Sequence, residues 1–203
     1  MQRIGLTGGI GSGKSTIATL LHSHGAFIVD ADAASRQLTA PGGKALPEIA
    51  KQLGASVMHP DGSMDRDAIR ALVLQSPAAR LQLEAIIHPL VSTETTRLAD
   101  HAVQSGYRCI IFDIPLLVES ARWRPRLDAI VVVDCRNSTQ IERVLTRESG
   151  RRGWTSHAVE KVIAVQASRS QRLAAADICI YNDGISLGVL AHIVDDVAAS
   201  FGL

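Results

Sequence analysis

Residues 8–16 combine glycines, a lysine and hydroxyl side chains at a spacing that can bind phosphate. They match the pattern G-x-x-x-x-G-K-[ST], with Gly8, Gly13, Lys14 and Ser15 at the fixed positions. Glycines let main-chain N–H groups turn toward phosphate oxygens, and the start of a following helix adds unpaired N–H groups and a positive dipole end. Lys14 can then reach the outer phosphates, and the Ser15 hydroxyl can ligate Mg²⁺. We therefore expect nucleoside triphosphate contacts from Gly11, Ser12, Gly13, Lys14, Ser15 and Thr16.

The flanks of this stretch support a loop between a strand and a helix. Residues 3–6 are typical of a short buried strand, and after the loop apolar residues recur at helical spacing, at Ile17, Ala18, Leu20 and Leu21. These flanks disfavour a glycine-rich turn without a ligand. A dinucleotide-binding fingerprint is excluded because G-x-G-x-x-G is never completed.

Carboxylates close two other strand-like runs. Asp30 and Asp32 follow the apolar residues 27–29, and Asp113 follows residues 109–112. In open parallel sheets ligands bind at the carboxyl ends of the strands, where the phosphate loop also begins. Asp32 can therefore serve the site, or act as the N-cap of a helix that follows it. Asp113 suits the acid on the Mg²⁺ side of phosphate-loop enzymes, and its alternative is a turn cap before Pro115.

Arginines on a later helix offer phosphate contacts. Gln140, Arg143 and Arg147 lie at i, i+3 and i+7, so they share one face of a predicted helix that Asn137 and Gln140 would start as a capping box. The face can bind phosphates or be a solvated charged stripe. The next residues, 149–155, contain two glycines, two arginines and a tryptophan, a composition that suits a lid over phosphates or a plain loop.

Strand-like runs alternate with helical patterns along the chain, which predicts an α/β fold with a five-stranded parallel sheet and helices on both faces. We expect a single phosphate-loop kinase domain over 1–203. Its core would comprise residues 1–31, 106–146 and 176–203, with a helical acceptor-binding insertion over 32–105, which is too long for a plain crossover. A lid over 147–157 and a helix to 175 complete the prediction. Pro89 should interrupt one helix of the insertion.

Composition gives narrower information. With 21 basic and 20 acidic residues, the chain has no overall positive electrostatic potential that would attract nucleic acid or a membrane surface. Cys109, Cys135 and Cys179 lie in or beside apolar runs without metal-ligand spacing, so we expect reduced thiols in the core. The first residues do not have the pattern of a secretion signal, which favours the cytoplasm.

With these residues identified, the chain resembles the dephospho-CoA kinase family almost from end to end. Beyond the loop, the resemblance rests on Asp30-Ala31-Asp32 with Arg36, residues 61–66, His88-Pro89, residues 113–119, the Gln140–Arg143–Arg147 face, and Gln166, Arg172, Asp177 and Asn182. The loop alone would identify only a superfamily. The Asp-Ala-Asp, His-Pro and Pro-Leu-Leu elements together are specific to this family.

The resemblance implies transfer of the γ-phosphoryl group of ATP, with Mg²⁺, to the 3′-hydroxyl of dephospho-CoA. Asp32 would accept the hydroxyl proton, Arg143 and Arg147 would close on the phosphates, and Asn182 would lie near adenine. The residues around the acceptor would be Arg36, His88, Leu116, Leu117 and Glu119. Judged from the residues alone, His88 lies at a helix break, where a structural role is the alternative to contact with the acceptor. The stretch 150–154 is longer than the family pattern, so Arg151 and Arg152 could replace or assist Arg147.

Two other functions compete with this interpretation. One is another small-acceptor kinase, acting on a nucleoside monophosphate or a small alcohol. The other is a GTP-binding switch, which is disfavoured because the sequence has no Asn/Thr-Lys-x-Asp segment for reading guanine.

Overall fold

The computed structural model comprises residues 1–203 and describes all of them except 121 and 150–153. Its contacts divide the chain into two compact units: Met1–Val29 with Ala102–Leu203, here called the sheet unit, and Asp30–His101, here called the helical unit. The helical unit is thus inserted into the sequence of the sheet unit. Each is described below by itself.

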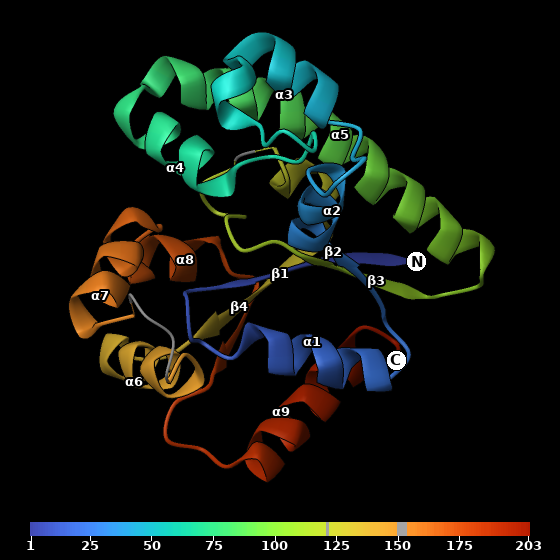
Figure 1. The fold of residues 1–203 in the computed structure, drawn as a ribbon. Helices are drawn as coiled ribbons and strands as arrows, with labels where there is room; N and C mark the ends of the chain where they lie inside the picture. The colour runs from blue at the N-terminus through green and yellow to red at the C-terminus, as the bar shows by residue number, and fades with distance from the viewer. Residues whose placement is uncertain (121, 150–153) are drawn as a thin grey trace. The chain divides into compact units, whose positions relative to one another are not determined.

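A five-stranded parallel sheet organises the first unit, as predicted (Figure 1). The strand order is β2-β3-β1-β4-β5, and the strands are β1 (Gln2–Gly8), β2 (Phe27–Asp30), β3 (Cys109–Asp113), β4 (Ala129–Asp134) and β5 (Ile178–Tyr181). In the register of the central strands, Leu6 lies opposite Asp113 and Gly8 lies opposite Val133. The carboxyl ends of β1, β3 and β4 therefore meet at one edge, where the phosphate loop begins.

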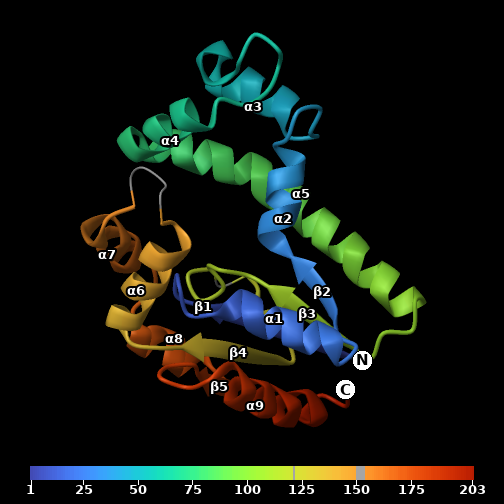
Figure 2. The same ribbon diagram turned by 60° about the horizontal axis from the view of Figure 1, so that its bottom comes forward.

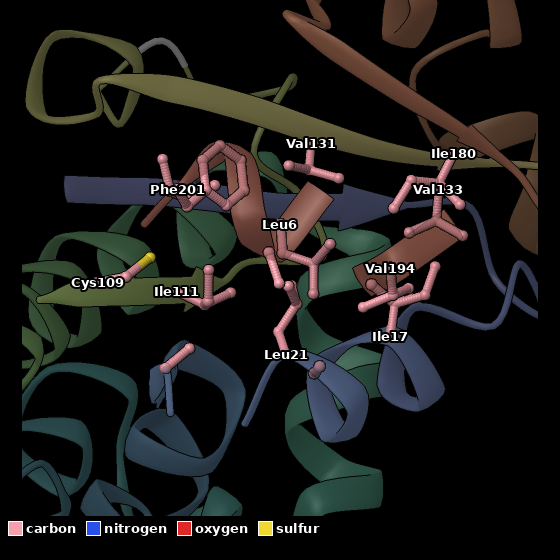
Figure 3. Close-up of a cluster of buried hydrophobic side chains, with 14 of the residues drawn as sticks. Leu6, Ile17, Leu21, Cys109, Ile111, Val131, Val133, Ile180, Val194 and Phe201 are labelled. Carbon is pink, nitrogen blue, oxygen red and sulfur yellow. The ribbon is translucent and has the colours of Figure 1, made fainter. Parts of the chain in front are cut away.

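Two helices cover one face of this sheet. They are α1 (Lys14–Ser23) and α9 (Leu187–Ser200), which contact each other and lie side by side in both views (Figures 1 and 2). Their apolar residues pack on strand side chains of the same face, such as Leu6, Ile111 and Val133 (Figure 3). Because every second residue of a strand points to this face, burial of these side chains fixes the register of the strands.

The opposite face is covered by α8 (Arg169–Ala175), which packs against β4, and by the segment after β3 with its short 3₁₀ turn η2 (Arg124–Arg126). Phe112 on this face stacks in a tilted arrangement with Trp123, with ring centroids 5.9 Å apart. The remaining helices of the unit are α6 (Asn137–Arg147) and α7 (Ser156–Val165). Helices therefore cover both faces, as the alternation of patterns predicted.

Two helix starts differ from the sequence prediction. The N-cap of α6 is Arg136 and no side chain caps it, so the expected Asn137–Gln140 capping box is wrong. Instead, the Gln140 side chain is buried at 1% exposure. The single helix expected over 156–175 is divided into α7 and α8, because Ser168 and Gln171 form a capping box that starts a new helix.

The helical unit contains α2 (Ala31–Leu38), α3 (Leu46–Leu53), the 3₁₀ turn η1 (Ala55–Val57), α4 (Arg66–Gln75) and most of α5 (Pro77–Gln104). Asp65 caps α4 by accepting from the amides of Asp67 and Ala68. A separate apolar core holds these helices together, and it includes Ile49, Ile69 and Ile86.

The predicted interruption at Pro89 is wrong, because α5 continues through it. Proline removes one helical hydrogen bond and crowds the preceding turn, at a cost of about 3 kcal/mol. The neighbouring side chains of Ile86, Leu90 and Val91 pack in the core of the helical unit. Burial of this apolar face offsets the cost of the proline.

The three cysteines are free, and two of them are core residues as expected. Cys109 and Cys135 are buried, and desolvation raises the pKa of each thiol to about 11. Cys179 is exposed, contrary to the prediction, because it lies on β5 at the edge of the sheet. Among the described residues, none of the helices has the length and apolar character needed to cross a membrane.

Candidate active site

The phosphate loop joins the end of β1 to the start of α1. Gly11 and Gly13 have φ angles of 72° and 95°, in the left-handed region that side chains disfavour, and Gly13 is the N-cap of α1. The turn is closed by the amide of Ser12, which donates to the Gly9 carbonyl at 3.1 Å. No hydrogen bond joins the amides of Gly11, Gly13, Lys14 or Ser15 to any residue in the described ranges. These amides can therefore donate to a bound anion.

Lys14 and Asp113 are brought together at this loop. The Lys14 ammonium contacts the Asp113 carboxylate, and both side chains are largely buried. The strand register explains the contact, since Asp113 lies opposite Leu6, just before the loop. Ser15 follows Lys14 in the first turn of α1 and is exposed. The two residues predicted to ligate a metal are therefore both next to Lys14: Ser15 follows it in the sequence, and Asp113 contacts its ammonium.

Arg143 and Asn182 both bind the main chain of the loop. Arg143 donates from Nη1 to the Ser12 carbonyl at 3.2 Å, and Asn182 donates from Nδ2 to the same oxygen at 2.8 Å. The Asn182 amide nitrogen also donates to the Asp134 carbonyl at 2.8 Å, which fixes the residue at the end of β5. Sequence reasoning placed these residues at phosphate and adenine. In the structure their side chains hold the loop itself.

The loop packs directly on α6 and α8. A Cβ added to Gly9 would lie 2.2 Å from Gln140 Nε2 and 3.1 Å from Arg172 Nη2, and one added to Gly11 would lie 2.6 Å from the Gln140 carbonyl oxygen. Arg172 is buried at 5% exposure. Both glycines are therefore required for close approach, and Gly11 is also required for its main-chain conformation.

Ion pairs that were not predicted from the sequence fix the ends of β4 and β5. Asp134 accepts from Nε and Nη2 of Arg169, with the shortest distance 2.6 Å. Asp183 accepts from the Arg136 guanidinium at 2.8 and 3.0 Å, from the Arg136 amide at 2.8 Å, and from Thr139 at 2.9 Å. The Arg136 side chain, followed by its amide, holds the pKa of Asp183 well below its usual range. Such pairs have no sequence signal, because their partners are more than thirty residues apart.

The residues after β3 differ in their exposure. Leu116 is 51% exposed, whereas Leu117 is buried and a Cβ at Gly5 would lie 2.6 Å from its side chain. Glu119 accepts from the Ala167 amide at 2.6 Å. Arg147 pairs with Glu148 at 3.0 Å, and its side chain is exposed. Of the three residues after β3, Leu116 and Glu119 are therefore exposed and Leu117 is buried.

Several predicted residues belong to the helical unit. Asp30 is the N-cap of α2 and accepts from the Ala33 amide at 2.8 Å, so the alternative role of Asp32 as the N-cap is wrong. Asp32 is exposed in the first turn of α2, and Arg36 lies 3.4 Å from Asp30. His88 is an interior residue of α5. Arg151 and Arg152 lie outside the described residues, as do the other residues of the stretch 150–153 in the predicted lid.

Three features together define a phosphate-loop kinase. They are the loop between a strand and a helix, the pairing of its lysine with the acid of a neighbouring parallel strand, and the order of the strands in the sheet. A solved structure titled TT1252 from Thermus thermophilus has a TM-score of 0.81 at 28% identity, covering 98% of this chain and 97% of the other. A shikimate kinase from Acinetobacter baumannii shares the fold, with a TM-score of 0.51 at 13% identity and coverage of 97% and 90%.

The family profile of dephospho-CoA kinase matches residues 2–187. A dephospho-CoA kinase of Albidiferax ferrireducens is 55% identical over 203 residues, which cover 100% of this chain and 94% of the relative. One of Burkholderia pseudomallei is 50% identical over 191 residues, covering 94% and 91%. The chain belongs to the dephospho-CoA kinase family, and its activity is the final step of coenzyme A synthesis.

Proposed function

We propose that this chain binds ATP through the phosphate loop and transfers the γ-phosphoryl group to the 3′-hydroxyl of dephospho-CoA. The unpaired amides of the loop and the Lys14 ammonium would bind the triphosphate. The observation that carries the donor site is the Lys14–Asp113 contact beside two loop glycines with positive φ. Because phosphoryl transfer depends on alignment and charge stabilisation, a preformed loop supplies much of what the donor needs.

Arg143 and Arg147 extend this proposal to the charge that develops during transfer. Arg143 is held at the loop through the Ser12 carbonyl, so its guanidinium is near the place where phosphates would bind. Arg147 lies one helical turn further along α6, with an exposed side chain. Arginines provide forked, charge-assisted hydrogen bonds to phosphate oxygens. We assign both residues to stabilisation of the transferred group, and Asn182 to the adenine side of the loop.

The donor set fits Mg²⁺. Ser15 offers a hydroxyl and Asp113 a carboxylate, which are hard oxygen ligands, and Mg²⁺ commonly takes one or two protein ligands together with substrate phosphates. The Asp113 carboxylate is already directed to the loop, where it contacts Lys14. Bound Mg²⁺ would neutralise charge on the β- and γ-phosphate oxygens. Ser15 and Asp113 are the residues that would hold it.

Asp32 is the proposed base for the acceptor hydroxyl. Asp30 makes the capping hydrogen bond of α2, so the Asp32 carboxylate is not needed to start the helix. A carboxylate within reach of the hydroxyl could accept its proton as transfer proceeds. Arg36, His88, Leu116, Leu117 and Glu119 are proposed to surround the acceptor. Because its side chain is buried, Leu117 would contact the acceptor through its main chain, or would hold the neighbouring residues in place.

An acceptor panel tests the proposal. The chain would be mixed with Mg²⁺ and either ATP or GTP, and then with dephospho-CoA, nucleoside monophosphates or small alcohols, and ADP or GDP release would be measured. We expect release with ATP and dephospho-CoA, and a product with one added phosphoryl group by mass. Preferred use of another acceptor, or of GTP, would contradict it. These substrates are consistent with the proposed location in the cytoplasm.

A further inference from the structure

Gln166 lies between α7 and α8 and reaches the phosphate loop. It is the C-cap of α7, and its Oε1 accepts from the Ile10 amide at 3.1 Å. The two residues are 156 positions apart in sequence. This contact uses an amide in the middle of the loop to bind a side chain, whereas the amides of Gly11, Gly13, Lys14 and Ser15 are left for an anion.

The segment that joins α7 to α8, residues 166–168 and here called the joint, is fixed by hydrogen bonds to neighbouring elements. The next residue, Ala167, donates its amide to Glu119 at 2.6 Å, and its carbonyl accepts from the buried Arg172 guanidinium. Ser168 then starts α8 with a capping box. The position of the Gln166 side chain is therefore determined by three neighbouring contacts, which is what a group that positions another must have.

Loop conformation depends on the Ile10 contact for a geometric reason. Ile10 lies between Gly9, which packs against Gln140 and Arg172, and Gly11, which has a positive φ. Rotation of the Gly9–Ile10 peptide would turn the Ile10 N–H away from Gln166 and change the direction of the amides that follow. The hydrogen bond to Gln166 opposes that rotation, because a polar group left unsatisfied in a part-buried place is costly.

We propose that Gln166 is a positioning residue for the donor phosphates. It holds the Ile10 peptide so that the amides of Gly11, Gly13 and Lys14 face one bound anion, and it links that anion to the joint between α7 and α8. The proposal rests on the proposed function, since it takes the triphosphate of ATP as the anion. Gln166 does not touch the reacting atoms in this account.

Two glutamines on the same joint allow a matched test. Gln166→Leu removes the acceptor of the Ile10 amide, and Gln166→Met does so with an unbranched side chain of similar length. Gln171→Leu is the control, because it removes the acceptor for the Ser168 amide at 2.8 Å and weakens the joint without touching the loop. For each variant, ADP affinity would be measured by calorimetry with Mg²⁺, and KM for ATP and for dephospho-CoA by ADP release. Thermal unfolding would show which variants are folded.

We expect Gln166→Leu and Gln166→Met to weaken ADP binding and raise KM for ATP on the order of tenfold, the effect of one lost hydrogen bond in a part-buried place. KM for dephospho-CoA should change less than twofold, and Gln171→Leu should bind ADP within twofold of the parent chain. Equal weakening in Gln166→Leu and Gln171→Leu, or unchanged ADP affinity in folded Gln166→Met, would overturn the role of Gln166. Failure of the unmodified chain to bind ADP would instead overturn the donor site itself.

Discussion

Gly11→Ala is the substitution that most directly probes how the phosphate loop is packed. The added methyl group meets two obstacles. At φ 72° the main chain is in the left-handed region, and the new Cβ would lie 2.6 Å from the Gln140 carbonyl oxygen and 3.1 Å from Gln140 Cα. The two Gln140 atoms belong to the main chain of α6, so they cannot move aside as the end of a side chain could.

Gly25→Ala separates these two effects. Gly25 has φ 95°, but a Cβ there would have no heavy atom within 4 Å. This control therefore carries only the conformational cost, about 1–2 kcal/mol. Gly11→Ala carries that cost and an overpacking cost of about 1–3 kcal/mol. The sum, about 2–5 kcal/mol, is a large part of the stability of a typical domain.

Thermal and chemical denaturation would measure both variants. For a chain of this size, 1 kcal/mol corresponds to roughly 2–4 °C, so Gly25→Ala should lower Tm by about 2–8 °C and Gly11→Ala by about 4–20 °C. Gly11→Ala should also lose ADP binding, because the loop amides can no longer keep their directions. Equal losses of stability in the two variants, with ADP affinity preserved in Gly11→Ala, would refute close packing of the loop on α6.

Three further predictions concern catalysis, thiol reactivity and acid stability. Asp32→Asn should lower kcat by a factor of about 10²–10⁴ with ADP affinity unchanged, and near-normal turnover would remove Asp32 from the role of base. Thiol labelling of the native chain should modify Cys179 first, whereas Cys109 and Cys135, whose pKa values are raised to about 11, should react only after unfolding; early modification of either would contradict their burial. Because the folded-state pKa of Asp183 is lowered, its ionised form stabilises the fold above the unfolded-state pKa of about 3.9, and this contribution is lost as pH falls below that value. Asp183→Asn should therefore flatten the decline of stability in that acidic range, and an unchanged decline would show that Asp183 contributes nothing to it.

The strands and the loop were predictable because their signals are local. Two of the predicted strands, residues 27–30 and 109–113, are apolar runs closed by an acid whose limits agree with the structure, and the loop pattern requires its residues at fixed spacing. Parallel order also follows from alternation of strands and helices. The sheet and the position of the loop could thus be predicted from sequence alone.

The errors have a common origin in contacts between distant residues. Pro89 did not end α5 because the apolar side chains around it are buried, which no local rule for proline includes. Asn137 does not cap α6, although its residue type suits a cap. Cys179 is exposed because β5 is an edge strand, and strand order is a property of the whole fold.

The roles of residues around the loop depend even more on such contacts. Gln166 was identified only through family resemblance, and its hydrogen bond to Ile10 joins residues from opposite ends of the chain. Asn182 was expected near adenine, yet its amide group holds the Ser12 carbonyl. The spacing of residues in the sequence identified residue types suited to phosphate chemistry. The residues that hold the loop in place could be identified only from the three-dimensional structure.

The measurement that tests the donor site most directly is transfer of label from [γ-³²P]ATP to dephospho-CoA by the parent chain and by Lys14→Ala. We expect labelled coenzyme A with the parent chain. We expect no label above background with a folded Lys14→Ala variant, because the ammonium at the loop is lost. Label transfer by Lys14→Ala at a rate comparable to that of the parent chain would contradict the assignment of the loop as the site of phosphoryl donation.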